Sequence, residues 1–362
     1  MLSSLLNRKK SFDVTFDPLD ERIEVPRGET VLSAGLSAGL ALPHSCRVGS
    51  CGTCKCRLVE GKIHPLTDAS YILSREELRD GYILACQSQP RSDLQIIYDN
   101  YDPDASVISA TMVRGEIIQT RMLTHDIIAV RIRIDGRIQY HAGQYAEVYI
   151  PAIDVKRSYS FATAPTPGGN CELCFHVRYV PGGAMTDWLH ATDRTGEDVR
   201  LTAPYGTFWL RSTDTPILCV AGGSGMAPIK AILEHAASRG CTRPVHFFFG
   251  ARTQADLYCL EEMKAVEERW AAPFAFIPIL SEEPGTSNWR GERGLVTDAV
   301  IRANLELAHY EAYLCGPPPM IDATIDILRK GGMNSNSIYF DKFLDSSHVT
   351  PAVPETQSET VS

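Results

Sequence analysis

The pattern of hydrophobic and polar residues changes twice along the chain and divides it into three parts. In the first hundred residues, Phe12 to Phe16 and Glu21 to Val25 alternate between apolar and polar positions, as the strands of a hairpin do. Thr30 to Leu40 follows as a short helical run, and Asp93 to Ile97 has the pattern of a closing strand. We therefore expect a small β-rich domain over residues 10–100.

The second part consists of short alternating segments separated by turn residues. Ile127 to Ile134 is β-branched and alternating, Asp135-Gly136 predicts a turn, and Tyr145 to Ile150 is the next strand. This pattern predicts an antiparallel barrel or sandwich over residues 107–210. The polar residues 99–107, which include a proline, are expected to link it to the first part.

In the third part, over residues 215–345, buried strand runs alternate with helical faces. Ile217 to Ala221 is an apolar strand run, and a helical face from Ile229 to Ala236 ends at Gly240. Further strands are expected at residues 245–249, 274–280, 310–314 and 338–340, and a further helix at 320–330. The alternation predicts a doubly wound α/β domain that binds its ligand at the carboxyl ends of the strands. Residues 346–362, rich in Ser, Thr, Pro and Glu, are expected to be disordered.

Composition excludes several classes of protein. The 362 residues suffice for several domains at roughly 100–200 residues each. A net charge of −9 disfavours a nucleic-acid partner, and no apolar run reaches the roughly 18 residues of a membrane span. The apolar part of Met1 to Lys10 is too short for a signal peptide. We therefore expect a cytoplasmic protein whose thiols are reduced.

Four of the 11 cysteines are clustered within residues 46–56. The spacing of Cys46, Cys51 and Cys54, with Cys86 farther along, is typical of a plant-type [2Fe–2S] site with these four thiolates as ligands. Three ligands then come from one loop and the fourth from a distant strand end. Zinc is the alternative, although zinc sites favour paired short spacings. Cys56 is interpreted as a buried neighbour.

The second part contains two motifs that suit a flavin. Arg157-Ser158-Tyr159-Ser160 offers a cation for a diphosphate, a ring for stacking and a hydroxyl for a ring nitrogen. Val177 to Leu189 combines a strand, the Gly182-Gly183 turn and a helix start, with the Thr186 hydroxyl facing a phosphate. Each motif alone is weak, because an ordinary strand, or a turn with an N-cap, is the better explanation of it in isolation.

Other residues of the second part are interpreted as structural. Cys171 and Cys174 lie three positions apart on a predicted strand and therefore point to opposite faces, which argues against a shared redox or metal site. His176, on the same strand, is expected to be structural or to line the flavin edge.

The third part contains two glycine-rich segments. Gly222 to Pro228 follows a buried strand and opens a helix, but it lacks the G-x-G-x-x-G spacing of the usual dinucleotide fingerprint. By itself it predicts only a phosphate near a helix N-terminus. The second segment, Leu314 to Met320, contains Cys315. From the sequence alone, Cys315 can be an ordinary buried thiol or part of a ligand site.

The motifs, in this order after a ferredoxin-like domain, resemble those of the ferredoxin–NADP reductase superfamily, and the domain order resembles that of bacterial oxygenase reductases. Ala203 to Phe208 is similar to the segment that closes the flavin barrel, with Ala203 in place of the usual glycine. The resemblance covers roughly residues 10–345. It implies a β-grasp-like [2Fe–2S] ferredoxin domain, an antiparallel β-barrel FAD domain and a doubly wound NAD domain.

The resemblance also assigns individual residues. Residues implied to bind FAD are Arg157, Ser158, Tyr159, Ser160, Val177, Gly182, Gly183, Met185 and Thr186. Residues implied to bind the nicotinamide cofactor are Gly223, Ser224, Gly225, Pro228, Arg252, Asp256, Gly316, Pro317 and Met320. Residues implied to shape the hydride-transfer site are Ser160, Cys315, Asp341 and Phe343. Because Arg252 has no second basic neighbour for a 2′-phosphate, NADH is expected rather than NADPH.

By this resemblance, electrons pass from NADH to FAD, to the cluster and then to a partner. The implied partner is a terminal oxygenase or hydroxylase, which can be a membrane-bound diiron enzyme acting on hydrocarbon or aromatic compounds, or its ferredoxin. The chain itself is expected to be a monomer. Two alternatives are a stand-alone NAD(P)H reductase of flavin, quinone or ferric acceptors, and a docking module that has lost its cluster.

Overall fold

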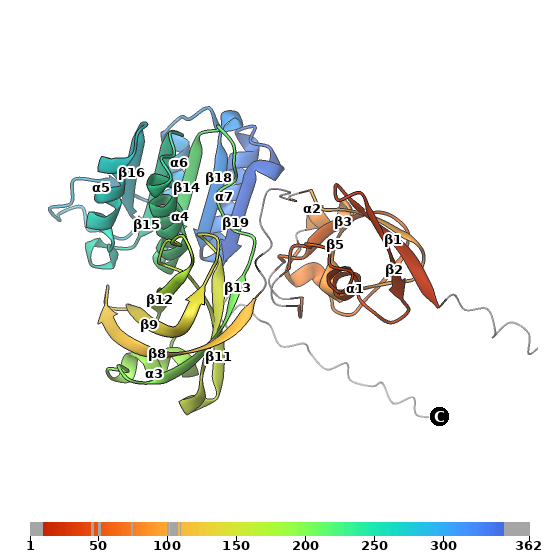
Figure 1. Ribbon diagram of the computed structural model, residues 1–362. Coiled ribbons are helices and arrows are strands. Elements are labelled where there is room, and N and C mark those ends of the chain that lie inside the picture. Colours follow the sequence, from red (N-terminus) through yellow and green to blue (C-terminus); the bar gives the residue numbers. More distant parts are fainter. Residues whose placement is uncertain are drawn as a thin grey trace, which may run out of the picture.

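The structure is a computed structural model, which describes residues 10–44, 47–49, 52–73, 75–99, 101, 108 and 110–343. The chain forms three domains in sequence order, coloured red to orange, yellow to green, and green to blue in Figure 1. The second and third domains are stacked, and the first lies beside them. Most of the expected linker and all of the expected disordered tail lie outside the described residues.

The first domain is a mixed sheet with one principal helix. Its elements are β1 (Ser11–Asp17), β2 (Glu21–Pro26), α1 (Val31–Ser37), β3 (Lys55–Glu60), β4 (Ile63–Pro65), α2 (Arg75–Arg79), β5 (Tyr82–Leu84), β6 (Ser88–Pro90) and β7 (Leu94–Ile97). The strand order is β2-β1-β7-β3-β5, and the hairpin register pairs Phe12 with Val25. The Thr30 hydroxyl caps α1 by accepting from the Ser33 amide at 3.2 Å. The predicted hairpin, helix and closing strand are confirmed.

The second domain is a curled antiparallel sheet. Its elements are β8 (Thr111–Met122), β9 (Ile127–Ile138), β10 (Tyr145–Ile150), β11 (Val155–Ser160), β12 (Asn170–Arg178), α3 (Ala184–Ala191) and β13 (Asp198–Tyr205). The order is β11-β10-β13-β8-β9-β12, and a bridge between Phe161 and Phe175 joins the two edges. The sheet thereby closes into the predicted barrel around an apolar core.

The turn predicted at Asp135-Gly136 is wrong, because β9 continues through both residues to Ile138. Gly136 has a φ of 89°, and the pairing of β9 with β12 shifts register between Asn170 and Glu172. The glycine therefore marks an irregularity inside a long strand and not its end.

The third domain is a parallel sheet covered on both faces. Its elements are β14 (Ile217–Gly222), α4 (Met226–Ser238), β15 (Val245–Ala251), α5 (Leu260–Arg269), β16 (Phe274–Leu280), β17 (Glu292–Arg293), α6 (Val296–Arg302), β18 (Glu311–Gly316), α7 (Pro318–Lys330) and β19 (Ile338–Lys342). The order is β17-β16-β15-β14-β18-β19. Phe247 and Phe249 pack with α4 and α5, whereas Phe248 packs with α6 and α7. This is the predicted doubly wound fold, in which alternate strand residues face opposite helix layers. In the described part of the chain, no helix combines the length and apolar character needed to cross a membrane.

Candidate functional site

The four side chains expected at the hydride-transfer site come together from distant segments. Ser160 ends β11, and its hydroxyl donates a hydrogen bond to the Asp341 carboxylate in β19. Cys315 of β18 is the register partner of Asp341. The Phe343 amide donates to the Gly316 carbonyl at 2.9 Å, which holds the segment after β19 against the end of β18. The second and third domains therefore share this site.

Burial controls the protonation of two of these groups. It raises the pKa of Asp341 to about 7, although the hydrogen bond from Ser160 acts in the opposite direction. Burial, with the charge of Asp341 as a second cause, also raises the pKa of the Cys315 thiol well above its ordinary value. The site thus combines a neutral thiol with a carboxyl group that can hold or release a proton near neutral pH.

The carboxyl ends of β14 and β18 meet where only glycine fits. A Cβ on Gly225 would lie 2.1 Å from the Cys315 carbonyl oxygen, and one on Gly316 would lie 2.8 Å from the Gly222 oxygen. Gly223 has a φ of 54° and leads through a single turn into α4. The arrangement leaves a bare backbone and a helix N-terminus at the strand ends, which suits the diphosphate of a nicotinamide cofactor.

Other residues implied to bind the nicotinamide cofactor surround this junction. Ser224 lies in the turn, and Pro228 is buried in the first turn of α4. Pro317 occupies the N-cap position of α7. Met320 lies so near Gly222 that a Cβ on Gly222 would be 2.8 Å from the Met320 sulfur.

The Gly182-Gly183 turn supports the start of α3. Gly182 has a φ of 74°, and a Cβ on Gly183 would come within 2.9 Å of the Val180 oxygen. The Thr186 hydroxyl donates to that oxygen at 2.9 Å, so it is already engaged by the turn itself. No side chain caps the helix N-terminus. The groups that this turn offers to a phosphate are therefore backbone amides.

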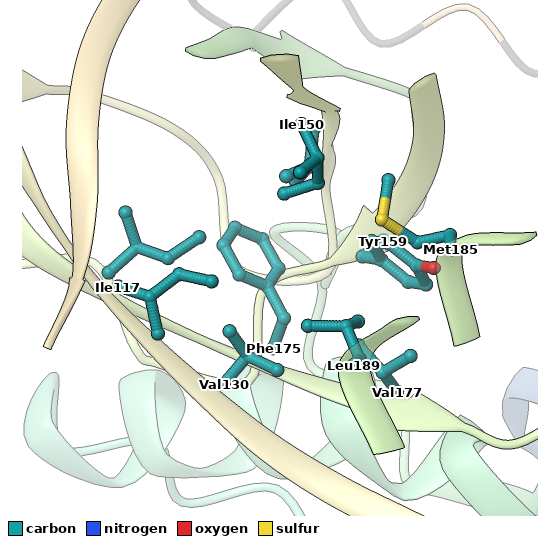
Figure 2. A pocket seen from close by; sticks show the side chains of 10 residues that line it. Ile117, Val130, Ile150, Tyr159, Phe175, Val177, Met185 and Leu189 are labelled. Atoms are coloured by element: carbon teal, nitrogen blue, oxygen red, sulfur yellow. The ribbon is translucent and has the colours of Figure 1, made fainter. Parts of the chain in front are cut away.

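The other residues implied to bind FAD divide between the inside and the outside of the barrel. Tyr159, Val177 and Met185 point into the apolar interior of the barrel (Figure 2), where the cavity is only about 10 Å³. Arg157 and Ser158 are exposed on β11, which leaves the Arg157 guanidinium accessible to a diphosphate. The side chains of Tyr159, Val177 and Met185 therefore pack in the core of the barrel.

The structure describes two of the four predicted cluster ligands, since Cys46 and Cys51 lie outside the described residues. Cys54 and Cys86 are buried and adjacent, because the Ala85 amide donates to the Cys54 carbonyl at 3.1 Å. The Gln87 amide group donates to the Cys86 sulfur at 3.7 Å and to the Arg47 carbonyl at 3.2 Å. Two neighbouring thiols, one of them accepting from an amide, fit an iron–sulfur cluster.

Gly49 packs against Gln87, the neighbour of Cys86, and Cys56 lies in the core of the first domain. Gly49 has a φ of 81°, and a Cβ there would lie 2.7 Å from the Gln87 side chain. Cys56 is fully buried, and burial raises the pKa of its thiol to about 12.

Arg252 and Asp256 form a charged cluster with two residues that the sequence did not single out. Arg252 binds Asp126 at 3.1 Å and Asp256 at 2.8 Å, and Asp126 also pairs with Arg178 at 3.2 Å. Asp126 lies at the tip of the β8–β9 hairpin, so it reaches the third domain from the second. No motif indicates Asp126, because its partners lie 52 and 126 positions away.

His176 and the Cys-x-x-Cys pair lie near a polar cavity between the second and third domains. The cavity has a volume of about 240 Å³ and is lined by β8, β9, β12, α4 and α5. His176 is buried with its ring edge against Tyr258, and burial lowers its pKa to about 3, so the ring is neutral. Cys171 and Cys174 are free, half-buried thiols on β12, and only Cys174 lines this cavity.

Comparison with known proteins agrees with this arrangement. Three family models match in order: a 2Fe–2S iron–sulfur cluster binding domain over residues 14–91, an oxidoreductase FAD-binding domain over 114–209, and an oxidoreductase NAD-binding domain over 219–326. The fold and sites thus define an iron–sulfur flavoprotein reductase with NAD as its third cofactor.

Individual relatives extend the match to nearly the whole chain. The xylene/toluene monooxygenase electron transfer component of Pseudomonas putida is 44% identical over 322 residues, which are 89% of this chain and 91% of that protein. The phenol 2-monooxygenase reductase component of a Pseudomonas species is 36% identical, covering 92% of this chain and 94% of that protein. The crystal structure of the Amycolatopsis cytochrome P450 reductase GcoB superposes with a TM-score of 0.72 at 30% identity, covering 92% of this chain and 98% of that one.

The chain belongs to this family of ferredoxin-containing reductases. It is an NADH-dependent oxidoreductase that carries FAD and a [2Fe–2S] cluster. The fold class expected from the sequence is confirmed.

Proposed function

We propose that the chain is the reductase component of a multicomponent oxygenase and supplies electrons to a hydroxylase or dioxygenase acting on hydrocarbon or aromatic compounds. The observation that carries the proposal is the shared site of Ser160, Cys315 and Asp341, in a chain that also contains the cysteine-rich ferredoxin domain. The named relatives are components of such oxygenases.

When bound, a flavin accepts electrons in pairs and releases them singly, which connects a hydride donor to a one-electron cluster. The residues of the chain position these reactants. Ser160 and Asp341 would offer a hydroxyl and a carboxyl group to a bound flavin, and Asp341 can hold a proton near neutral pH. Cys315 presents a small uncharged side chain where the nicotinamide meets the ring. Phe343 follows β19, is held at the end of β18 by its backbone amide, and would shield the flavin.

The cysteines at 46, 51, 54 and 86 are proposed to hold the cluster. We place the domains at residues 10–100, 107–210 and 215–345. We also propose a monomeric, cytoplasmic protein whose partner is a terminal oxygenase, with a membrane-bound diiron hydroxylase as the specific form. The support for that form is the 44% identity to the xylene/toluene monooxygenase component.

NADH-driven oxygen uptake tests this function. The full-length holoprotein is mixed with a candidate terminal oxygenase and its hydrocarbon substrate, and oxygen consumption and hydroxylated product are measured. The proposal expects product in proportion to NADH oxidised. If NADH is consumed only with free flavin, quinone or ferric complexes, and with no oxygenase tested, the chain is a stand-alone reductase.

A further inference from the structure

We propose that Phe340 is the residue on which the ferredoxin domain docks, and that it positions this domain for electron transfer from the flavin to the cluster. Phe340 lies on the edge strand β19 and is 38% exposed. The ammonium group of Lys55, in the ferredoxin domain, lies 5.6 Å from the centre of its ring. This is a cation–π contact between two domains.

The contact is built from groups that are held in place. The Lys55 ammonium is paired with Glu77 at 2.5 Å and also faces the Tyr82 ring at 5.4 Å. On the other domain, Lys342 lies 5.4 Å from the centre of the same Phe340 ring and pairs with Asp322 at 2.6 Å. The ring is therefore in contact with two cations, each oriented by a carboxylate. An arrangement of this kind costs little further side-chain entropy when the domains meet.

Both partners are sequence neighbours of the redox sites. Lys55 directly follows Cys54, a predicted cluster ligand, and Phe340 directly precedes Asp341, which lies at the hydride-transfer site. Because side chains alternate along a strand, Phe340 faces outward while Asp341 faces the opposite side. The contact thus joins the surface of one redox site to the surface of the other. Because the rate of electron transfer falls steeply with the distance between the two sites, a contact at this place favours transfer.

A second observation places the cluster loop near the barrel. Tyr205 has a pKa raised by burial and by Glu147, and the Arg47 guanidinium of the cluster loop lowers it from across the domain boundary. Along the sequence, Arg47 directly follows Cys46 and Lys55 directly follows Cys54, both predicted ligands. In Figure 1 this domain turns β3, β5 and α2 toward the third domain, which contains β19. The docked face is therefore the face that carries the cluster.

The inference rests on the proposed function, with its cluster ligands and flavin site. The experiment distinguishes a failure of the inference from a failure of the proposed function. The fully loaded holoprotein is mixed with NADH in a stopped-flow instrument, and the flavin and cluster absorbances are followed separately. Phe340→Leu removes the π face but retains bulk. We expect flavin reduction to change less than twofold, and cluster reduction to slow roughly two- to fivefold, the range of one exposed cation–π contact. Phe340→Trp should restore the parent rate.

Two further measurements distinguish docking from a general loss of structure. In small-angle X-ray scattering, Phe340→Leu should increase the radius of gyration, whereas Ile301→Ala, an exposed apolar residue of α6, should not. In a double-mutant cycle, adding Lys55→Met to Phe340→Leu should slow cluster reduction no further. Parent-like cluster reduction and scattering in Phe340→Leu would overturn the inference. A parent protein with no flavin or cluster absorbance would instead overturn the proposed function.

Discussion

The boundary between the second and third domains and the contact of the ferredoxin domain differ in construction. At the first boundary, Arg211, which directly follows the second domain, donates its amide to the Tyr313 hydroxyl of the third domain at 2.9 Å. Within the third domain, Arg243 pairs with Glu311 at 2.7 Å, with both side chains 7% exposed. Arg243 also donates to the Arg211 carbonyl at 2.9 Å. The ferredoxin domain instead contacts the third domain through the exposed Phe340 ring.

This difference matches the two kinds of transfer. A hydride moves only between atoms in contact, so Ser160 and Cys315 must stay in register and a rigid buried boundary suits them. A single electron crosses a gap, so a half-exposed contact is sufficient and can be released for an external acceptor. We therefore expect the buried boundary to serve transfer from the nicotinamide, and the exposed Phe340 contact to serve transfer to the partner.

The largest expected effect comes from removing a proposed cluster ligand. Cys86→Ser should reduce electron delivery to cytochrome c, a one-electron protein acceptor, to near background, because the cluster loses one of its four thiolates. NADH oxidation with a dye that accepts from the flavin should stay within about twofold, since the second and third domains are untouched. Parent-like cytochrome c reduction in this variant would show that electrons leave by another route.

The buried ion pair of the third domain, whose Arg243 also holds the boundary residue Arg211, is tested by Glu311→Leu, which leaves the Arg243 guanidinium buried without its carboxylate. We expect the free energy of unfolding of the third domain to fall by about 3 kcal/mol, measured by urea titration. The double variant Arg243→Met with Glu311→Leu should recover much of the loss, because no uncompensated charge remains. Asp13→Asn, at an exposed ion pair, is the matched control and should cost under about 1 kcal/mol. Equal losses of unfolding free energy in Glu311→Leu and Asp13→Asn would contradict the contrast between a buried and an exposed ion pair.

The raised pKa of Asp341 gives folding stability a pH dependence opposite in sign to that from most carboxylates. Its pKa rises from 3.8 when exposed to about 7 in the fold, so the folded state binds the extra proton. Between these values, stability falls as pH rises, and the penalty is complete above pH 7. The Tm of Asp341→Asn minus the Tm of the parent should therefore increase by roughly 4 °C as the pH is raised from 5 to 8. A difference in Tm that stays constant over this range would refute the assignment.

The smallest expected effect concerns the choice of nicotinamide. Arg252 is already bound by Asp126 and Asp256, so it is poorly placed to bind a 2′-phosphate, and the two carboxylates repel one. Asp126→Asn should raise the ratio of kcat/KM for NADPH over NADH by up to roughly fivefold. Asp154→Asn, which changes an exposed carboxylate that follows β10 and accepts from the Tyr149 hydroxyl, serves as a control for loss of one surface carboxylate. An unchanged ratio in Asp126→Asn would leave Asp256 as the discriminating group.

The sequence alone determined the features that are local along the chain. The cysteine spacing from Cys46 to Cys54 indicates a cluster because three ligands lie in one loop, and the glycine-rich segments predict their turns because only glycine tolerates that backbone. Alternation and helical faces gave the fold class for the same reason, since each pattern repeats within a few residues. The wrong prediction of a turn at Gly136 shows the limit of such local patterns, because pairing of β9 with the distant strand β12 overrode the local signal for a turn.

Only the tertiary structure decided which distant side chains meet. The hydrogen bond from Ser160 to Asp341 spans two domains, Asp126 meets Arg252 across another part of the same boundary, and Lys55 reaches Phe340 from a separate domain. Such contacts leave no periodic trace in the sequence, because strand order and domain packing set the distance between residues that are far apart along the chain. Burial, which sets the pKa of Asp341, is likewise a property of the assembled domains and not of the neighbouring residues.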